Sequence, residues 1–148
     1  MQEFLDVSYR RQEQVLVVRW MQQMRTAVDF EAGYRYVLQL AQQYQCRFWL
    51  LDVRRCSPNC AQQAQWLLHE FCPLLEKAFT PASLIFGAHL VAPSHLAHYQ
   101  DVVVPILAQP MNSRYQVAAF IDEGPTTRWL HDQQPATLSV AAPPLPGL

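Results

Sequence analysis

Near the middle of the chain lies a continuous apolar run, Phe48-Trp-Leu-Leu-Asp-Val53, which contains one acid near its end and is followed by two arginines. A strand with this pattern is covered on both faces, because neither set of alternating side chains is consistently polar. Strands of this kind are usually parallel, and parallel strands need long crossover connections that are most often helices. The run therefore predicts an α/β fold built on a mostly parallel sheet.

The first twenty residues predict two further strands. Residues 4–10 alternate between apolar and polar side chains, and Val15–Trp20 is apolar and rich in β-branched residues. The polar stretch 11–14 separates them, although it lacks the Asn-Gly pair that favours the commonest hairpin turn. We therefore expect an antiparallel hairpin at the start of the sheet.

Two amphipathic helices are predicted on either side of the central run. From Thr26 onward apolar side chains recur at helical spacing: Phe30, Tyr34, Val37, Leu38, Ala41 and Tyr44. A second helix is expected near Asn59, either with Asn59 and Gln62 as a capping box or with Ser57 as cap and Pro58 in the first turn. Pro73 is expected to kink this helix, because proline has no backbone N–H to donate.

The remaining segments continue the alternation of strands and helices. We expect a strand over Leu84–Ala92, a helix capped by Ser94 and reaching about Ala108, a strand over Tyr115–Ile121 and a short helix over Thr126–His131. The order β-β-α-β-α-β-α-β-α places helices on a mostly parallel five-stranded sheet. Residues 1–134 are expected to form one domain and 135–148 a Pro-rich mobile tail with few large side chains to bury.

Composition and charge restrict the function classes. With 148 residues, of which 51% are hydrophobic and 16% charged, the chain can build one apolar core. The formal net charge of -1 is too small to gather nucleic acid or anionic lipid. The longest apolar runs are far shorter than the roughly 18 to 20 residues that span a bilayer, and the start is acidic. We therefore expect a cytoplasmic protein with no integral membrane segment and no nucleic-acid partner.

Neither the cysteines nor the glycines predict a catalytic or metal site. Cys46, Cys56, Cys60 and Cys72 are interpreted as reduced packing residues, because a core of this size needs no disulfides. Zinc binding by Cys56, Cys60, His69 and Cys72 fails on reach, since Cys60 and His69 would lie about 13 Å apart along one helix. The glycines form neither a phosphate-binding loop nor a nucleophile elbow. We expect no metal, no cofactor and no enzymatic activity.

Two other groups of side chains allow more than one role. His89, His95 and His98 fall in one segment and could form a functional cluster, although two exposed histidines and one in a strand explain the same pattern. The four tryptophans either line an apolar ligand cavity or, more commonly for such residues, anchor the core or an interface: Trp20, Trp49, Trp66 and Trp129.

Several segments together suggest a family. They are Phe48-Trp-Leu-Leu-Asp-Val-Arg54, Gln65-Trp-Leu67 with Phe71-Cys-Pro-Leu74, and Arg128-Trp-Leu130 after Phe120-Ile-Asp122. With the expected layout from Phe4 to about His131, they resemble the SpoIIAA-like, STAS/SEC14 group of small bacterial domains. The resemblance implies a SpoIIAA-like fold and a non-enzymatic role, because related domains act as phosphorylation-switched antagonists of anti-sigma factors, as modules of sensory complexes and transporters, or as binders of apolar ligands.

One departure from that family concerns its phosphorylation switch. In the sigma-regulating relatives the switch serine follows the strand-ending aspartate by two residues, whereas here Arg54 stands two residues after Asp52. We therefore expect that Ser57 is not an obligatory phosphorylation site.

The loop after the central strand contains the candidate site. Asp52, Arg54, Arg55, Ser57 and Asn59 lie between the carboxyl end of a strand and the start of a helix, where open α/β sheets place ligands and where helix amides favour anions. In the alternative interpretation the serine and asparagine only cap the helix, the aspartate ends the strand and the arginines form solvated ion pairs.

These observations favour a regulatory or protein-interaction domain that contacts an unknown protein partner through this loop. The alternative is a module that binds a small apolar ligand or lipid between the sheet and a helix. A homodimer is also expected, because the first hairpin should leave an edge strand partly uncovered.

Overall fold

In the computed structural model, which describes residues 4–22, 26–80, 83–112 and 114–134, the two N-terminal strands form the predicted hairpin. β1 (Leu5–Arg10) pairs antiparallel with β2 (Val15–Trp20). Gln14 at the turn has a positive φ of 58°, so a glutamine adopts the left-handed conformation that asparagine and glycine favour in tight turns. The predicted tail over 135–148 lies outside the described residues.

The other three strands are parallel, as expected. β3 (Phe48–Asp52), β4 (Ile85–Leu90) and β5 (Tyr115–Phe120) extend the sheet in the order β1-β2-β3-β4-β5, so that neighbours in the sheet are also neighbours in the chain. β2 pairs parallel with β3, with Arg19 opposite Asp52. The sheet is therefore antiparallel only at the hairpin, and its parallel strands end at one common edge.

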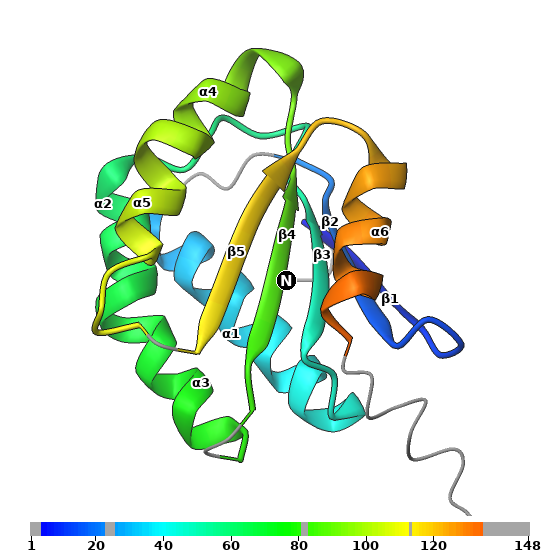
Figure 1. Ribbon diagram of the computed structural model, residues 1–148. Helices are drawn as coiled ribbons and strands as arrows, with labels where there is room; N and C mark the ends of the chain where they lie inside the picture. Colours follow the sequence, from blue (N-terminus) through cyan, green and yellow to red (C-terminus); the bar gives the residue numbers. More distant parts are fainter. Residues whose placement is uncertain (1–3, 23–25, 81–82, 113, 135–148) are drawn as a thin grey trace, which may run out of the picture.

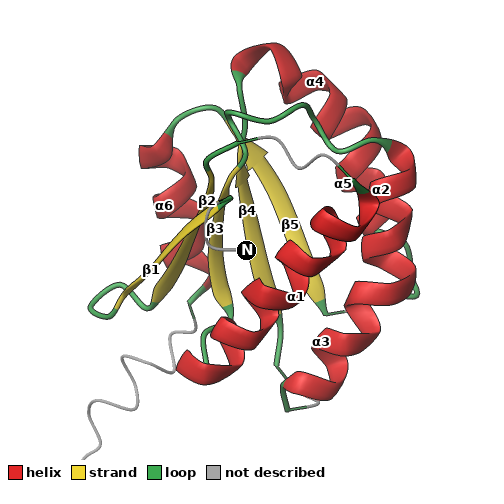
Figure 2. Cartoon of the chain, turned by 180° about the vertical axis from the view of Figure 1, so that it is seen from behind, coloured by secondary structure: helices red, strands yellow, loops and turns green. Residues whose placement is uncertain are grey.

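Helices cover the two faces of the sheet unequally. α1 (Ala27–Tyr44) and the helical segments that follow β3 and β4 lie on one face, whereas α6 (Glu123–Gln133) crosses the other face alone within the described residues (Figure 1). Figure 2, turned by 180° from Figure 1, shows the first of these faces toward the viewer, with α1, α2 and α3 in front of the strands. Side chains of β3 alternate accordingly: Trp49 and Leu51 pack in the larger core beneath α1, and Leu50 packs in the smaller core beneath α6.

Each of the two helical segments that follow β3 and β4 contains a widened turn before a proline. The first comprises α2 (Ala61–Trp66), a π-helical turn (Leu67–Phe71) and α3 (Cys72–Ala78). The second comprises a 3₁₀ turn (Pro93–His95), α4 (Leu96–His98), a π-helical turn (Tyr99–Val103) and α5 (Val104–Leu107). Pro73 and Pro105 each follow two residues after a π-helical turn ends. Pro73, where we predicted a kink, therefore lies just after a local widening of the helix, a feature that also bends helices.

Three predicted helix starts were wrong. The second helix begins at Ala61 and is capped by Cys60, whose Sγ accepts the Gln63 N–H (3.4 Å) while Gln63 Oε1 accepts the Cys60 N–H (3.0 Å). Ser94 lies within the 3₁₀ turn and makes no capping hydrogen bond. The last helix begins at Glu123 instead of Thr126. Cap preferences failed here because a cysteine thiol is a rare cap and because Asn59 is bound by a distant part of the chain.

Candidate functional site

The predicted site residues gather at the carboxyl edge of the sheet but divide between two environments. Asp52 is the last residue of β3 and is buried, whereas Arg54, Arg55 and Ser57 are exposed in the loop that follows. Asn59, near the end of that loop, is buried again. The site therefore has a charged outer part on the side of α6 and an inner part beneath α1.

The outer part is a network of ion pairs centred on Asp52. Its carboxylate receives Arg19 Nη1 at 2.8 Å and Arg54 Nη2 at 2.9 Å. Arg19 Nη1 also lies 3.1 Å from Glu123 of α6, and Arg10 Nη2 lies 3.2 Å from the same carboxylate. The network therefore joins β1, β2, β3 and α6, and three arginines are engaged by two shared acids.

The arginines set the ionisation of both acids. Burial acts to raise the pKa of Asp52, but hydrogen bonds from Arg54 and Arg19 outweigh it and hold this pKa below its usual value. The hydrogen bond from Arg19, with a smaller contribution from Arg10, lowers the pKa of Glu123. Both acids are therefore charged at neutral pH, and the Arg54 side chain is held by Asp52.

Arg55 behaves differently from its neighbour. Its Nη1 lies 3.6 Å from the sulfur of Met21, just after β2, and both side chains are exposed. The two residues border a hollow of about 490 Å³ that is also lined by the ion-pair network: Asp6, Arg19, Trp20, Asp52, Arg54 and Glu123. Sequence analysis treated Arg54 and Arg55 as an equivalent pair, whereas in the structure both are exposed but only Arg54 is bound by Asp52.

The inner part is organised around Asn59. Its backbone N–H donates to the Tyr99 hydroxyl (3.2 Å), and its carbonyl oxygen receives His98 Nε2 (2.6 Å). Because a carbonyl oxygen can only accept, His98 must carry its proton on Nε2. His98 and Tyr99, in the helical segment that follows β4, thus fix the loop that follows β3. Asn59 therefore anchors this loop and does not cap a helix.

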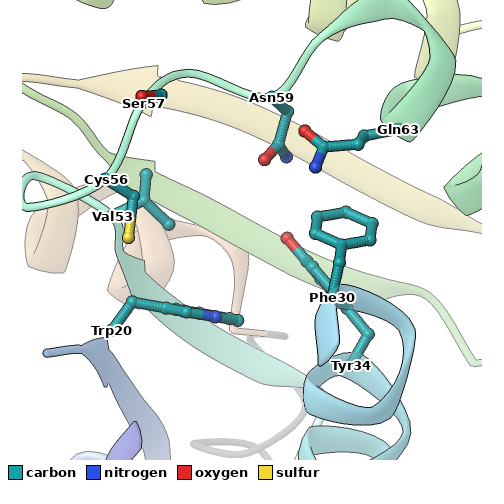
Figure 3. A pocket seen from close by; sticks show the side chains of 8 residues that line it. All are labelled: Trp20, Phe30, Tyr34, Val53, Cys56, Ser57, Asn59 and Gln63. Carbon is teal, nitrogen blue, oxygen red and sulfur yellow. The ribbon is translucent and has the colours of Figure 1, made fainter. Parts of the chain in front are cut away.

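The Asn59 side chain enters a small cavity beneath this loop. Figure 3 shows the Asn59 amide and the Tyr34 hydroxyl pointing into the same space from opposite sides, with Trp20 and Phe30 beside them. The cavity has a volume of about 20 Å³ and is also lined by Val53, Cys56, Ser57 and Gln63. Sequence analysis did not single out Tyr34, whose position on the apolar stripe of α1 indicated only core packing.

The three histidines do not form one cluster. His89 lies in β4 and is fully buried, and burial lowers its pKa to about 4. His98 is occupied by Asn59, and His95 lies partly buried in the 3₁₀ turn. Among the described residues, no group of three or more His, Cys, Asp or Glu side chains is placed to hold a metal ion.

The cysteines and tryptophans have several roles. Cys46 and Cys72 are buried, Cys56 is partly buried, and Cys60 is exposed as a helix cap, so packing explains only part of the set. Trp49 is a core residue, and Trp129 of α6 packs against Phe86 and Phe120. Trp20 lines both the hollow and the small cavity, and Trp66 lines a groove between α1 and α2.

Comparisons of the chain with protein-family models, with curated proteins and with solved structures gave no significant match. In the part of the chain that the structure describes, no helix has the length and apolar character required to cross a membrane.

Proposed function

We propose that this protein is a non-enzymatic regulatory or protein-interaction domain of the bacterial STAS-like type that contacts a partner protein through the β3–α2 loop, residues 53–60. The hollow beside Arg55 and Met21 carries this proposal. Arginine and methionine are enriched at protein interfaces, and here an exposed pair of them borders a surface that the Asp52 network holds in shape. Because Arg19 and Arg54 beside the hollow are already paired with Asp52, Arg55 is the arginine that best suits an acidic group on the partner.

Affinity measurements on variants test this role. Partners are first recovered by crosslinking in host cells, and the dissociation constant of a purified partner is then measured for the wild type and for Arg55→Ala. We expect Arg55→Ala to weaken binding by about 5- to 20-fold, the range of an interfacial arginine at moderate burial. Arg11→Ala is the matched control, because Arg11 is exposed in the hairpin turn at the other end of the strands. Equal affinities for wild type and Arg55→Ala would remove the loop from the interface.

A second candidate function is binding of a small, mainly apolar ligand, the role that the SEC14-like side of the resemblance implies. The small cavity between Trp20, Tyr34 and Asn59 favours it together with the adjoining groove between α1 and α2, because the two join aromatic walls to buried polar atoms. Native mass spectrometry of protein purified from its own host tests this function. A bound small molecule is the expected result, and a purely apo spectrum under gentle desolvation would count against it.

The cellular setting belongs to the same proposal. We place the protein in the cytoplasm, as a homodimer, without metal, cofactor or nucleic acid. The weak net charge of -1 supports the last of these, since nucleic-acid binding depends largely on phosphate neutralisation.

A further inference from the structure

Two buried polar atoms face the small cavity and make no full hydrogen bond to the described residues, although the Asn59 side chain lies near enough to Tyr34 to oppose the rise in pKa that burial gives the Tyr34 hydroxyl. They are the hydroxyl oxygen of Tyr34 and the amide nitrogen Nδ2 of Asn59. Tyr34 is 1% exposed and Asn59 is 7% exposed. Buried polar groups are almost always paired, because leaving one unpaired costs on the order of 1 to 3 kcal/mol. Two such atoms at one cavity leave a place for a further oxygen atom, supplied by a water or by a ligand.

Both residues are held in place by their neighbours. Tyr34 is held by aromatic contacts, with ring centroids 5.0 Å from Phe30, 5.5 Å from Trp20 and 5.3 Å from Phe71. Asn59 is held through its backbone by His98 and Tyr99. The Tyr34 ring and the Asn59 backbone are therefore in place before any ligand arrives, which reduces the entropy that binding must overcome.

The chemistry of the two atoms selects an oxygen acceptor. Asn59 Nδ2 can only donate, and the Tyr34 hydroxyl can donate to the same atom. A cavity of about 20 Å³ accommodates one group of that size. Its lining contains no charged side chain, so a carboxylate or phosphate would be buried there without a counterion. The site thus suits the oxygen of a neutral carbonyl or hydroxyl group.

An adjacent groove provides space for the remainder of such a molecule. Phe30 and Gln63 line the small cavity and also a groove of about 270 Å³ between α1 and α2. Trp66 lies along this groove and meets Phe30 edge to face at 5.8 Å between ring centroids. The groove therefore offers aromatic surface next to the polar cavity.

We propose that this groove and cavity bind a neutral, mainly apolar small molecule whose carbonyl or hydroxyl oxygen accepts hydrogen bonds from Asn59 Nδ2 and the Tyr34 hydroxyl. The inference rests on the second function proposed above, for which it names the ligand class and the two recognising atoms. It is independent of partner binding at Arg55, which lies on the other side of the strand ends.

A matched pair of probes tests the recognition of oxygen. Acetophenone carries a carbonyl oxygen, and α-methylstyrene has the same shape with a methylene group in its place. Both are titrated into the ¹⁵N-labelled full chain while the tryptophan indole signals are followed. We expect acetophenone to shift the Trp20 and Trp66 signals saturably and to bind about tenfold more tightly than α-methylstyrene, the effect of one well-made buried hydrogen bond.

Tyr34→Phe removes only the hydroxyl and should preserve the fold, because that oxygen makes no full hydrogen bond to the described residues. In this variant acetophenone should bind about five- to tenfold more weakly, whereas α-methylstyrene should bind as before. Tyr44→Phe is the control, since Tyr44 lies near the other end of α1 and stacks on Tyr9.

The outcomes separate the two claims. If both probes bind equally well, or if Tyr34→Phe leaves the affinity for acetophenone unchanged, oxygen recognition is wrong while ligand binding stands. If neither probe binds at concentrations up to the solubility limit, the cavity holds water only, and both the inference and the ligand-binding function are overturned.

Discussion

Arg54 donates three hydrogen bonds to the carboxylate of Asp52, two residues before it in the chain. Its backbone N–H and Nε donate to Oδ1 at 3.2 and 3.0 Å, and its Nη2 donates to Oδ2 at 2.9 Å. The neighbouring Arg55 instead lies against Met21. Two consecutive arginines therefore serve different purposes, and their variants should differ accordingly.

We expect Arg54→Ala to lower the free energy of unfolding by about 1 kcal/mol and Arg55→Ala to lower it by less than about 0.5 kcal/mol. The first figure is kept small because the Arg54 side chain is 44% exposed and solvent screens its pair with Asp52. Urea denaturation at low salt and at 1 M NaCl measures both effects, and the penalty for Arg54→Ala should shrink in salt. Equal penalties for the two variants would contradict the separation.

His89 should make the protein sensitive to mild acid. Burial lowers its pKa to about 4, so the folded state keeps the ring neutral while the unfolded chain binds a proton below about pH 6.5. Its contribution to stability is therefore complete above pH 6.5 and is lost as the pH falls from 6.5 to 4, by about 3 kcal/mol in total.

Comparison of variants isolates this effect. Between pH 7 and 4.5, His89→Leu should lose less unfolding free energy than the wild type, because the variant lacks the buried ring that becomes protonated on unfolding. Asp52 and Glu123 contribute little to the change over this range, because the stability from their lowered pKa values is lost only as the pH falls below their ordinary values of 3.8 and 4.5. Parallel pH profiles for wild type and His89→Leu would show that His89 is not the cause.

Gly87 leaves room for the hydroxyl of Tyr115. A Cβ atom at position 87 would collide with Tyr115 Oη and would lie 2.9 Å from the ring atoms Cε1 and Cζ. We expect Gly87→Ala to lower the free energy of unfolding by about 2 kcal/mol, the cost of overpacking a closely packed core. Because Tyr115 Oη is buried and has no partner among the described residues, Tyr115→Phe alone should be nearly neutral. A double-mutant cycle should show Tyr115→Phe recovering part of the loss, and strict additivity would contradict the proposed clash.

Gln45 ends α1 in an unfavourable conformation. Its φ of 52° is in the left-handed region, which costs an ordinary residue about 1 kcal/mol relative to glycine. We expect Gln45→Gly to raise the free energy of unfolding by about 0.5 to 1 kcal/mol, reduced by the lost hydrogen bond from its side chain to the Gln42 carbonyl (2.9 Å). Thermal and urea unfolding measure the change, with the exposed Gln42→Gly within the helix as a control that should destabilise. A less stable Gln45→Gly would contradict the strain.

The outer edge of β1 should mediate self-association. β1 pairs with β2 only, so within the described residues one side of its backbone has no strand partner. We expect a dimer by sedimentation equilibrium at about 50 μM. The amides of β1 should exchange more slowly at this concentration than in dilute protein. Amides of β5 at the opposite edge of the sheet provide the internal reference. A monomer at this concentration would exclude a stable dimer through β1.

The strands were predictable because their signals are local. The apolar run at Phe48 and the β-branched run at Val15 each predict a strand from within the segment itself, and the order of the segments then fixes a parallel sheet with helical crossovers. The helix starts were less predictable, since Asn59 is a better capping residue than Cys60 by general preference. The contacts of Asn59 with His98 and Tyr99, about forty residues later, decided between them.

The same limitation applies to the candidate site. Sequence placed Asp52, Arg54 and Arg55 on one loop but could not separate their roles, because Arg19 and Met21 belong to another strand and its exit. Tyr34 was recognised only as part of an apolar stripe. That its hydroxyl faces a cavity depends on where Trp20 and Asn59 lie, which no pattern within α1 reveals.

The sheet order that follows the chain order has a consequence for synthesis on the ribosome. Each strand finds its neighbour already made, so the sheet can grow in one direction without waiting for a distant segment. The exception is the face beneath α6, where Val17, Leu50 and Phe86 receive their helical cover only when residues 123–133 have emerged. A nascent chain that pauses before this point exposes an apolar sheet surface, and this intermediate is the one that chaperones would be expected to bind.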